Sequence, residues 1–479
     1  MSSATGIAGT LTDRTEDACT PLGRLERLCD AGSLEVIRSS VMSTRVGALA
    51  QPGDGVTAGI GRIDGRPVAC YAQDAKFLGG SLGAAHAETI DRLLQLAGRS
   101  HLPVVSIIES GGARMQEGTA ALYGYGRIFR QNVLLSGKVP QISVIAGLAA
   151  GGGCYSPALT DFVVMTEGAA MFLTGPAVVR DVAGEEVGMQ ELGGRWVHER
   201  NGVCDFVMPS ENSAVDLARE LLGYLPQYAG GELPQAAAAA PQLSDPGECV
   251  PHSPRRVYDV RAVSDGIVDA GSLLEVAPRW ARNVVTGLAR IEGRPVGLIA
   301  NQPRYLGGVL DTESSQKAAR FVSSCDAFGL PLLVLVDTPG FMPGVQQERA
   351  GVIRFGASLV RAFAAATVPR VTVVLRKAFG GAFIAMNSRG LGADLVFAWP
   401  RAEIGVMGAH PATGIIHRRE LAAADDPDAR QDALSAAYAQ EHLGADVAAA
   451  GGFVDEVIEP HETRARVAGA LAALAGRDR

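Results

Sequence analysis

Runs of β-branched and aliphatic residues alternate along this chain with segments of helical periodicity. The apolar runs have the length and composition of strands that are buried on both faces of a sheet. They are 103–108, 142–147, 332–337 and 371–376. Residues 84–100 and 312–329 space their apolar positions as amphipathic helices and end in a turn before the next run. This strand–helix–strand order predicts an α/β fold.

The same pattern occurs twice. GRIDGRPV at 61–68 returns as ARIEGRPV at 289–296, an offset of 228 residues, and VPQISVIAGLAAGGG at 139–153 aligns with VPRVTVVLRKAFGGA at 368–382, an offset of 229. A period of this length indicates a duplicated domain rather than a solenoid. The sequence therefore predicts two tandem α/β domains.

Composition shifts give the expected boundaries. Residues 1–20 are polar and are predicted to be loose, and a short helix from Pro21 is expected to end at Gly32. Residues 229–256 are rich in Pro, Ala and Gly without periodicity, which is typical of a linker. The two domains are thus predicted to span 21–228 and 257–479.

Composition also excludes several classes of protein. The chain has 479 residues, of which 47% are hydrophobic and 20% charged, enough to bury two cores. Its net charge of -8 argues against a nucleic-acid surface. A basic and apolar leader is absent at the N-terminus, and no stretch approaches the roughly 20 apolar residues of a membrane span. We therefore expect no membrane contact and a cytoplasmic location.

Cysteine and histidine spacing suggests no metal site. The seven cysteines include no CxxC pair and fit reduced thiols, and the eight histidines form no i,i+4 pair. There is no phosphate-binding G-x-x-x-x-G-K-[ST] loop. None of the four lysines stands between methionines as in a biotin attachment site. Any energy source or carrier group that the reaction needs must come from elsewhere.

Glycines cluster directly after four of the predicted strands. The clusters are 110–114, 150–153, 338–341 and 379–382, and they form two repeat-related pairs. Glycine lets a ligand approach backbone N–H groups, and a strand that leads into a helix adds a favourable dipole for negative charge. This is the construction of an oxyanion hole. A single Gly-Gly pair is more often a tight turn, but four related clusters favour the functional interpretation.

Side chains suited to nucleophilic chemistry are scarce. There is no G-x-S-x-G elbow, and Ser110 beside two glycines is typical of a turn. Asp337 follows a buried run and fits either a base or a helix cap. Backbone N–H groups are therefore the favoured catalytic elements.

Eight strings in order across both halves resemble one family. The resemblance is to the carboxyltransferase, or β, subunit of biotin-dependent acyl-CoA carboxylases of the propionyl-CoA and methylmalonyl-CoA type, and it runs from about Leu22 to the C-terminus. The strings are SGGARMQEG (110–118), YSPALTDFVVM (155–165), FLTGP (172–176), ELGG (191–194), ANQPRYLGGVLD (300–311), KAARFV (317–322), DTPGFMPG (337–344) and RKAFGGAF (376–383).

This resemblance implies two crotonase-like domains, of the ClpP/crotonase superfamily, in a homo-oligomer. The family assembles hexamers in which the N-domain of one subunit faces the C-domain of another. It further implies that a coenzyme A thioester is the substrate, that biotin arrives on a separate carrier protein of a biotin carboxylase partner, and that no metal takes part.

The resemblance also implies roles for individual residues. The thioester oxygen would be held at Gly151, Gly152 and Gly153, with Ser110, Gly111, Gly112, Ala113 and Arg114 lining the acyl-CoA cleft. The biotin ureido oxygen would lie at Gly380, Gly381 and Ala382, near Phe341, Pro343 and Gly344. Carboxybiotin would then carboxylate the α carbon of a short acyl-CoA without a protein base.

Three positions depart from the family pattern. Ile384 stands where propionyl-CoA enzymes commonly have Asp, a position that tunes the acyl pocket. Pro411 interrupts the string that is usually GAQGAV, and Gly451–Asp455 replaces RGYVD. The identity of the acyl group is therefore left open. A specialised acceptor, including one not bound to CoA, fits these departures as well as neutral drift does.

Three alternatives remain at this point. The same site can run in reverse as a biotin-dependent decarboxylase of malonyl-type thioesters. A hydratase or isomerase would need acids such as Glu109 or Glu117 beside the first glycines. A scaffold subunit without turnover would have no reason to keep both glycine pairs.

Overall fold

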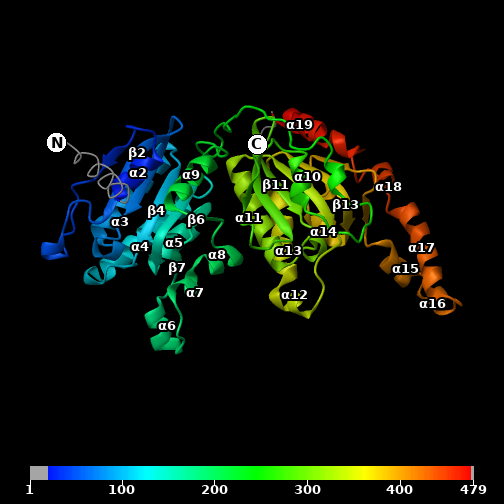
Figure 1. Ribbon diagram of the computed structural model, residues 1–479, viewed down its shortest axis with the longest axis horizontal. Coiled ribbons are helices and arrows are strands. Elements are labelled where there is room, and N and C mark those ends of the chain that lie inside the picture. Colours follow the sequence, from blue (N-terminus) through cyan, green and yellow to red (C-terminus); the bar gives the residue numbers. More distant parts are fainter. Residues whose placement is uncertain (1–19, 476–479) are drawn as a thin grey trace, which may run out of the picture. The chain divides into compact units, whose positions relative to one another are not determined.

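The computed structural model describes residues 20–475, and it divides into two compact units between Glu232 and Leu233 (Figure 1). Apart from Thr20, the segment 1–20 expected to be loose lies outside the described residues. Each unit is a sheet of eight strands with helices packed on it. The predicted α/β fold with two tandem domains is confirmed.

The first unit forms its sheet in the order β1-β2-β3-β4-β5-β6-β8, and β7 pairs with β5. β1, β2 and β3 are antiparallel, and the pairs from β3 to β8 are parallel. The strands are β1 (Glu35–Ile37), β2 (Val56–Ile63), β3 (Arg66–Gln73), β4 (Val104–Ser110), β5 (Gln141–Ala150), β6 (Phe162–Thr166), β7 (Ala170–Phe172) and β8 (Phe206–Met208).

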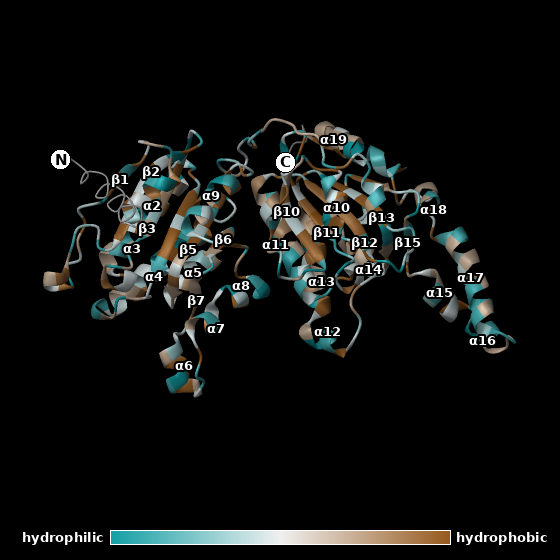
Figure 2. Ribbon diagram, viewed as in Figure 1, coloured by the Kyte–Doolittle hydropathy of each residue, from teal (hydrophilic) through white to brown (hydrophobic). Residues whose placement is uncertain are grey.

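Helices bury the apolar strands of this sheet. α3 (Ala84–Ser100) and α4 (Thr119–Leu135) pack on one another and close one core, whereas α2 (Pro21–Leu28) and α9 (Glu211–Leu222) form a second pair. The central strands accordingly lie at the hydrophobic end of the colour scale in Figure 2. α3 begins and ends at the residues that its periodicity predicted.

The second unit repeats this order as β9-β10-β11-β12-β13-β14-β16, with β15 on β13. Its strands are β9 (Leu274–Val276), β10 (Val284–Ile291), β11 (Arg294–Asn301), β12 (Leu332–Thr338), β13 (Arg370–Phe379), β14 (Leu395–Ala398), β15 (Glu403–Gly405) and β16 (Glu456–Val457). α11 (Thr312–Phe328) and α13 (Val352–Ala365) correspond to α3 and α4, and α10 (Val260–Asp265) and α19 (Thr463–Leu474) enclose the other core.

Strand register shows how closely the units agree. Ala69 lies opposite Val104 in the β3–β4 pair, and Gly297 lies opposite Leu332 in the β11–β12 pair, both 228 positions further on. The irregularity between Ile108 and Ser110 also recurs, between Val336 and Thr338. Both glycine clusters of each half therefore occupy the same place in each sheet.

An aspartate holds the first long hairpin of each unit. Asp30 accepts hydrogen bonds from the backbone N–H groups of Asp64 (3.0 Å) and Gly65 (2.8 Å), and Arg219 reaches it at 2.9 Å. Both turn residues have positive φ, as a type I′ hairpin requires.

The second unit repeats this support around another turn. Asp269 accepts from the N–H groups of Glu292 (2.9 Å) and Gly293 (2.7 Å), and Arg464 lies at 2.6 Å. Asp269 is more enclosed than Asp30, since its side chain is 3% exposed against 31%.

Two segments differ from simple expectation. α2 ends at Leu28 rather than Gly32, because Cys29 is already extended (φ -91°, ψ 160°). In the expected linker, the Ala236 N–H donates to the Gly293 carbonyl, and the Ala270 N–H donates to the carbonyl of Ala240. The segment 236–240 is thus bonded to the second unit. No helix within 20–475 is long and apolar enough to cross a membrane.

Candidate active site

The structure brings the two glycine clusters of the first unit together. β4 ends at Ser110 and β5 at Ala150, and Ser110 lies opposite Ala149 in the parallel pair. Gly112 has a φ of 98°, and a Cβ at that position would lie 3.1 Å from the Ala150 carbonyl oxygen. Only glycine allows the two strand ends to approach so closely.

Two backbone N–H groups at this junction have no acceptor within their helix. Gly151 adopts φ 56° and ψ -127°, a conformation open only to glycine, and its own N–H donates to the Phe172 carbonyl at 3.0 Å. Gly152 and Gly153 then form the first turn of α5 (Gly152–Ala158), where an N–H has no acceptor within the helix. Since α5 has only seven residues, these two donors matter more than a helix dipole.

The second unit builds the same turn. Gly380 has φ 60°, and Gly381 and Ala382 follow it in the first turn of α14 (Gly380–Ala385). A Cβ on Gly381 would lie 3.8 Å from the Phe341 ring, an ordinary contact. Phe341 therefore lies beside the turn, and its expected role in biotin binding stays a prediction.

The other residues expected to bind biotin or to set acyl specificity lie close by in the chain. Pro343 and Gly344 lead from Phe341 into α12 (Val345–Ala350). Ile384 stands on α14, two residues after Ala382, and is 50% exposed. Pro411 falls in the first turn of α15 (Ala409–Ile416), where the N–H it lacks would have no helical acceptor.

Arg114 does not offer its guanidinium to a cleft. Its side chain is fully buried and pairs with Asp54 at 2.6 Å and with Glu117 at 2.9 Å. The Arg114 guanidinium thus fixes the loop after β4 from within. That the segment from Ser110 to Arg114 lines the acyl-CoA cleft stays a prediction. Glu117 is engaged in the same cluster and also accepts from Ser43 at 2.9 Å, so it is not a free acid.

Carboxylate–arginine pairs support both strand ends, and no local pattern in the sequence predicts them. Arg24 on α2 donates to Glu109 at 2.7 Å, and a Cβ on Gly147 would lie 2.5 Å from a Glu109 oxygen. Asp337, 228 residues after Glu109, is paired with Arg376 at 3.0 Å. Arg376 stands 229 residues after Gly147, so the two arginines come from unrelated positions.

The second pair is the more deeply buried. Asp337 is 1% exposed, and the Tyr258 hydroxyl donates to its Oδ2 at 2.7 Å, whereas Oδ1 has no hydrogen-bond partner in the described part of the chain. Burial raises the pKa of the Asp337 carboxyl, although Arg376 opposes the rise. Asp337 is thus a buried structural residue and not a base that faces solvent.

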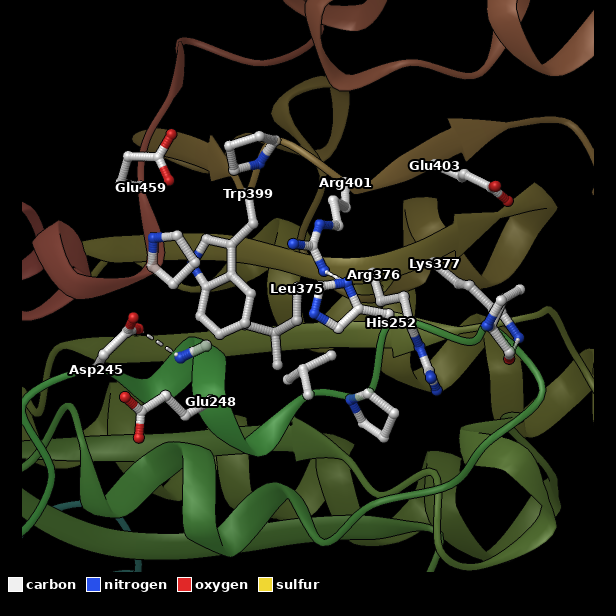
Figure 3. A pocket seen from close by; sticks show the side chains of 16 residues that line it. Asp245, Glu248, His252, Leu375, Arg376, Lys377, Trp399, Arg401, Glu403 and Glu459 are labelled. Atoms are coloured by element: carbon white, nitrogen blue, oxygen red, sulfur yellow. Dashed lines mark hydrogen bonds between the residues drawn. The ribbon is translucent and has the colours of Figure 1, made fainter.

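A separate cavity of about 680 Å³ lies in the second unit (Figure 3). Lys377 and Arg401 line one part of it, and Asp245, Glu248 and Glu459 line another. The Lys377 ammonium donates to the Pro254 carbonyl at 2.7 Å, so the basic part is already engaged by the chain itself. The residues that line this cavity do not include the glycine turn of α14.

No metal site is formed within 20–475, where no three His, Cys, Asp or Glu side chains are grouped to hold an ion. Two backbone turns, each at the junction of two parallel strands, place N–H groups without a helical acceptor at Gly152–Gly153 and at Gly381–Ala382.

Comparison with known proteins assigns the class. A family model described as "Carboxyl transferase domain" matches residues 13–479. The chain is 48% identical over 424 residues to the propionyl-CoA carboxylase carboxyltransferase subunit of Haloferax mediterranei, covering 87% of this chain and 82% of the relative. It is also 48% identical over 426 residues to the methylmalonyl-CoA carboxyltransferase 12S subunit of Propionibacterium freudenreichii subsp. shermanii, covering 88% and 81%.

A solved structure agrees. The transcarboxylase 12S crystal structure, described as a hexamer with methylmalonyl-coenzyme A and methylmalonic acid bound, superposes with a TM-score of 0.93 at 43% identity, covering 100% of this chain and 97% of that one. The two units are crotonase-like domains. The chain belongs to the carboxyl transferase family, and it is a carboxyltransferase.

Proposed function

We propose that this protein is the carboxyltransferase component of an acyl-CoA carboxylase, which moves CO2 from carboxybiotin on a carrier protein to the α carbon of a short acyl-CoA. One observation carries the proposal: the same turn, with two N–H groups that have no helical acceptor, is built twice, at Gly152–Gly153 and at Gly381–Ala382. Transfer between two carbonyl compounds needs charge stabilised on two oxygens, one in each partner.

The first unit, within 21–228, would take the thioester. The N–H groups of Gly152 and Gly153 would bind its carbonyl oxygen more strongly as the α proton leaves and negative charge develops there. Losing one such donor costs about 3 to 4 kcal/mol of barrier. The segment from Ser110 to Ala113 would form the neighbouring wall through its backbone.

The second unit, within 257–479, would take biotin. Its residues fit a flat ureido ring, because Gly381 leaves space beside the Phe341 face and Ala382 presents a second N–H. Carboxybiotin supplies the CO2 and, once this is released, a basic ureido nitrogen. The chain itself would hold the ureido oxygen with the Gly381 and Ala382 N–H groups and keep the ring on Phe341.

Assembly and partners follow from the relatives. The hexamer of the solved relative and the names of the carboxylase subunits support a homo-oligomer that works with a biotin carboxylase and a biotinylated carrier. Each acyl-side pocket would be completed by a biotin-side pocket of another copy. Ile384, half exposed on the biotin-side helix, would contact the acyl chain and select its length.

The test mixes purified protein with free biotin and either malonyl-CoA or methylmalonyl-CoA and follows decarboxylation. Activity on one ester would establish the reaction and the acyl size together. Gly126→Ala on α4 is a matched control, because a Cβ there meets nothing within 4 Å and alanine favours a helix. Failure on both esters, with the control and the parent equally folded, would contradict the proposal.

A further inference from the structure

Tyr125 lies directly behind the acyl-side turn. It comes from α4, far from the glycine clusters in sequence, and it is 5% exposed. A Cβ on Gly152 would lie 2.8 Å from its ring, which means that the ring rests against the Gly152 backbone. Any movement of this ring would displace the first turn of α5.

The Tyr125 hydroxyl lies beside the other half of the pocket. A Cβ on Gly153 would be 3.6 Å from that hydroxyl and 3.5 Å from Ser110 Cβ. Ser110 Oγ already donates its proton to the Gly80 carbonyl at 2.7 Å, and so can only accept. A single side chain thus contacts the α5 turn and lies next to the end of β4.

Among residues 20–475 this hydroxyl makes no hydrogen bond of regular geometry, and the Ser110 side chain is the neighbouring polar group that can accept from it. A buried hydroxyl needs such a partner, and so the contact with Ser110 is the one to explain. Burial raises the pKa of Tyr125 to about 12, although the nearby Ser110 opposes the rise. The group consequently stays protonated, and can donate, throughout the pH range in which the enzyme would work.

The biotin side has a ring but no such hydroxyl. A Cβ on Gly381 would lie 3.8 Å from the Phe341 ring, and Phe341 reaches the turn from the loop after β12 rather than from the second helix. The hydroxyl is therefore particular to the thioester side and is not a general requirement of the turn.

We propose that Tyr125 is a positioning residue of the acyl-side pocket, whose ring fixes Gly152 and whose hydroxyl holds Ser110 and the Gly153 turn in the geometry that binds the thioester oxygen. The proposal rests on the carboxyltransferase function proposed above. It assigns Tyr125 no contact with the substrate.

The first test compares Tyr125→Phe with the parent in biotin-dependent decarboxylation. We expect kcat to fall about tenfold, as for the loss of one neutral hydrogen bond, with KM for free biotin unchanged. Because the pKa lies near 12, the pH profiles of variant and parent should run parallel between pH 6 and 10. An unchanged kcat would contradict the role proposed for the hydroxyl. If the variant lost the acidic or basic limb of the pH–rate profile, Tyr125 would transfer a proton instead of positioning the turn.

Phe129→Leu is the control for this comparison. Phe129 packs on Tyr125 with ring centroids 5.6 Å apart but is a neighbour of the ring and not of the glycines. It should lower the melting temperature and leave kcat within about twofold of the parent. An equal loss of kcat in both variants would indicate packing alone.

A second test needs no turnover. Gly152→Ala forces a Cβ into the Tyr125 ring and should lower the melting temperature, and Tyr125→Leu in the same chain should restore part of the loss by removing the ring. If Tyr125→Leu makes the Gly152→Ala chain no more stable, the ring does not fix the turn. Rescue of stability in a protein inactive on both esters would leave the positioning contact standing and contradict only the proposed reaction.

Discussion

The two glycine turns follow the same backbone path and differ in the side chains that pack behind them. On the first unit Gly152 is pressed against Tyr125, so that a Cβ would come within 2.8 Å of the ring. On the second unit a Cβ on the corresponding Gly381 would lie 3.8 Å from the Phe341 ring, and the next residue is already alanine. The first turn is therefore packed tightly from within, whereas the second has room for a Cβ.

The carboxylate–arginine pairs at the strand ends also differ between the two units. Glu109 and Asp337 are equivalent by the repeat, yet one is held by Arg24 from a distant helix and the other by Arg376 from the adjacent strand. Duplication preserved the path of the main chain, which sets the N–H donors. The side chains that stabilise that path were replaced independently in each copy.

The largest effect that would test this difference is on activity. Gly152→Ala should lower biotin-dependent decarboxylation by about 1000-fold, because the Cβ cannot fit and the N–H donors must move. Gly381→Ala meets only an ordinary contact and should cost less than about tenfold. Initial rates of both variants, with circular dichroism to confirm folding, measure the contrast.

The matched control for the second unit is Gly469→Ala, since a Cβ there meets nothing within 4 Å. It should leave the rate unchanged. Equal losses in the Gly152 and Gly381 variants would show that the spacing behind the turns does not matter, and the comparison would fail.

A smaller effect on stability should separate the two carboxylate supports. Arg376→Met leaves the Asp337 carboxylate buried with Tyr258 as its side-chain donor, which should cost about 3 to 5 kcal/mol of unfolding free energy. Arg24→Met should cost about half as much, because the Glu109 side chain is 25% exposed and water compensates. Urea unfolding, read unit by unit by hydrogen exchange, distinguishes the two.

Replacing both partners of the buried pair provides the control. Asp337→Leu in the Arg376→Met background removes the uncompensated charge and should recover part of the lost stability. A double variant as unstable as Arg376→Met alone would mean that packing, rather than the buried charge, is responsible.

The hairpin aspartates should give the smallest difference. The Arg464 guanidinium and two backbone N–H groups outweigh burial and lower the pKa of Asp269, and the Gly65 N–H with Arg219 lowers the pKa of Asp30. A carboxyl group whose pKa is lower in the folded than in the unfolded protein stabilises the fold at pH values above its unfolded pKa, which is near 4. This stabilisation is lost as the pH falls through the folded pKa.

Asp269→Asn should therefore cost about 1 to 2 kcal/mol at pH 7 and progressively less below pH 4. Asp30→Asn should cost less, because Asp30 is more exposed. Urea midpoints at pH 7 and pH 3 give both values. A loss of equal size at the two pH values would contradict the assigned origin.

Local patterns were sufficient for much of the fold. The periodicity of 84–100 predicted α3 to the residue, and the apolar runs located β4, β5, β12 and β13. Parallel strands covered by helices are continuous apolar runs, which a sequence displays openly. The glycine clusters at their ends were visible for the same reason, and the roles of those glycines in binding remain predictions.

Long-range side-chain contacts were not visible in the sequence. Arg114 was expected to line a cleft, because nothing near it in sequence shows Asp54, which lies 60 positions away. Arg24 and Glu109 are 85 positions apart, and Tyr125 meets Gly152 only through the packing of α4. Such contacts depend on tertiary packing, whereas turns and periodicity are local.

The division of the chain at Glu232 also has a consequence during synthesis. Each sheet is complete within its own unit, so the ribosome releases every strand of the first sheet before the second sheet begins. At about 5 to 20 residues per second, the 247 residues from 233 to 479 take roughly 12 to 50 s to translate. The first unit can thus fold while still tethered, and only then must the nascent polypeptide form a second sheet of nearly identical register without exchanging strands with the first.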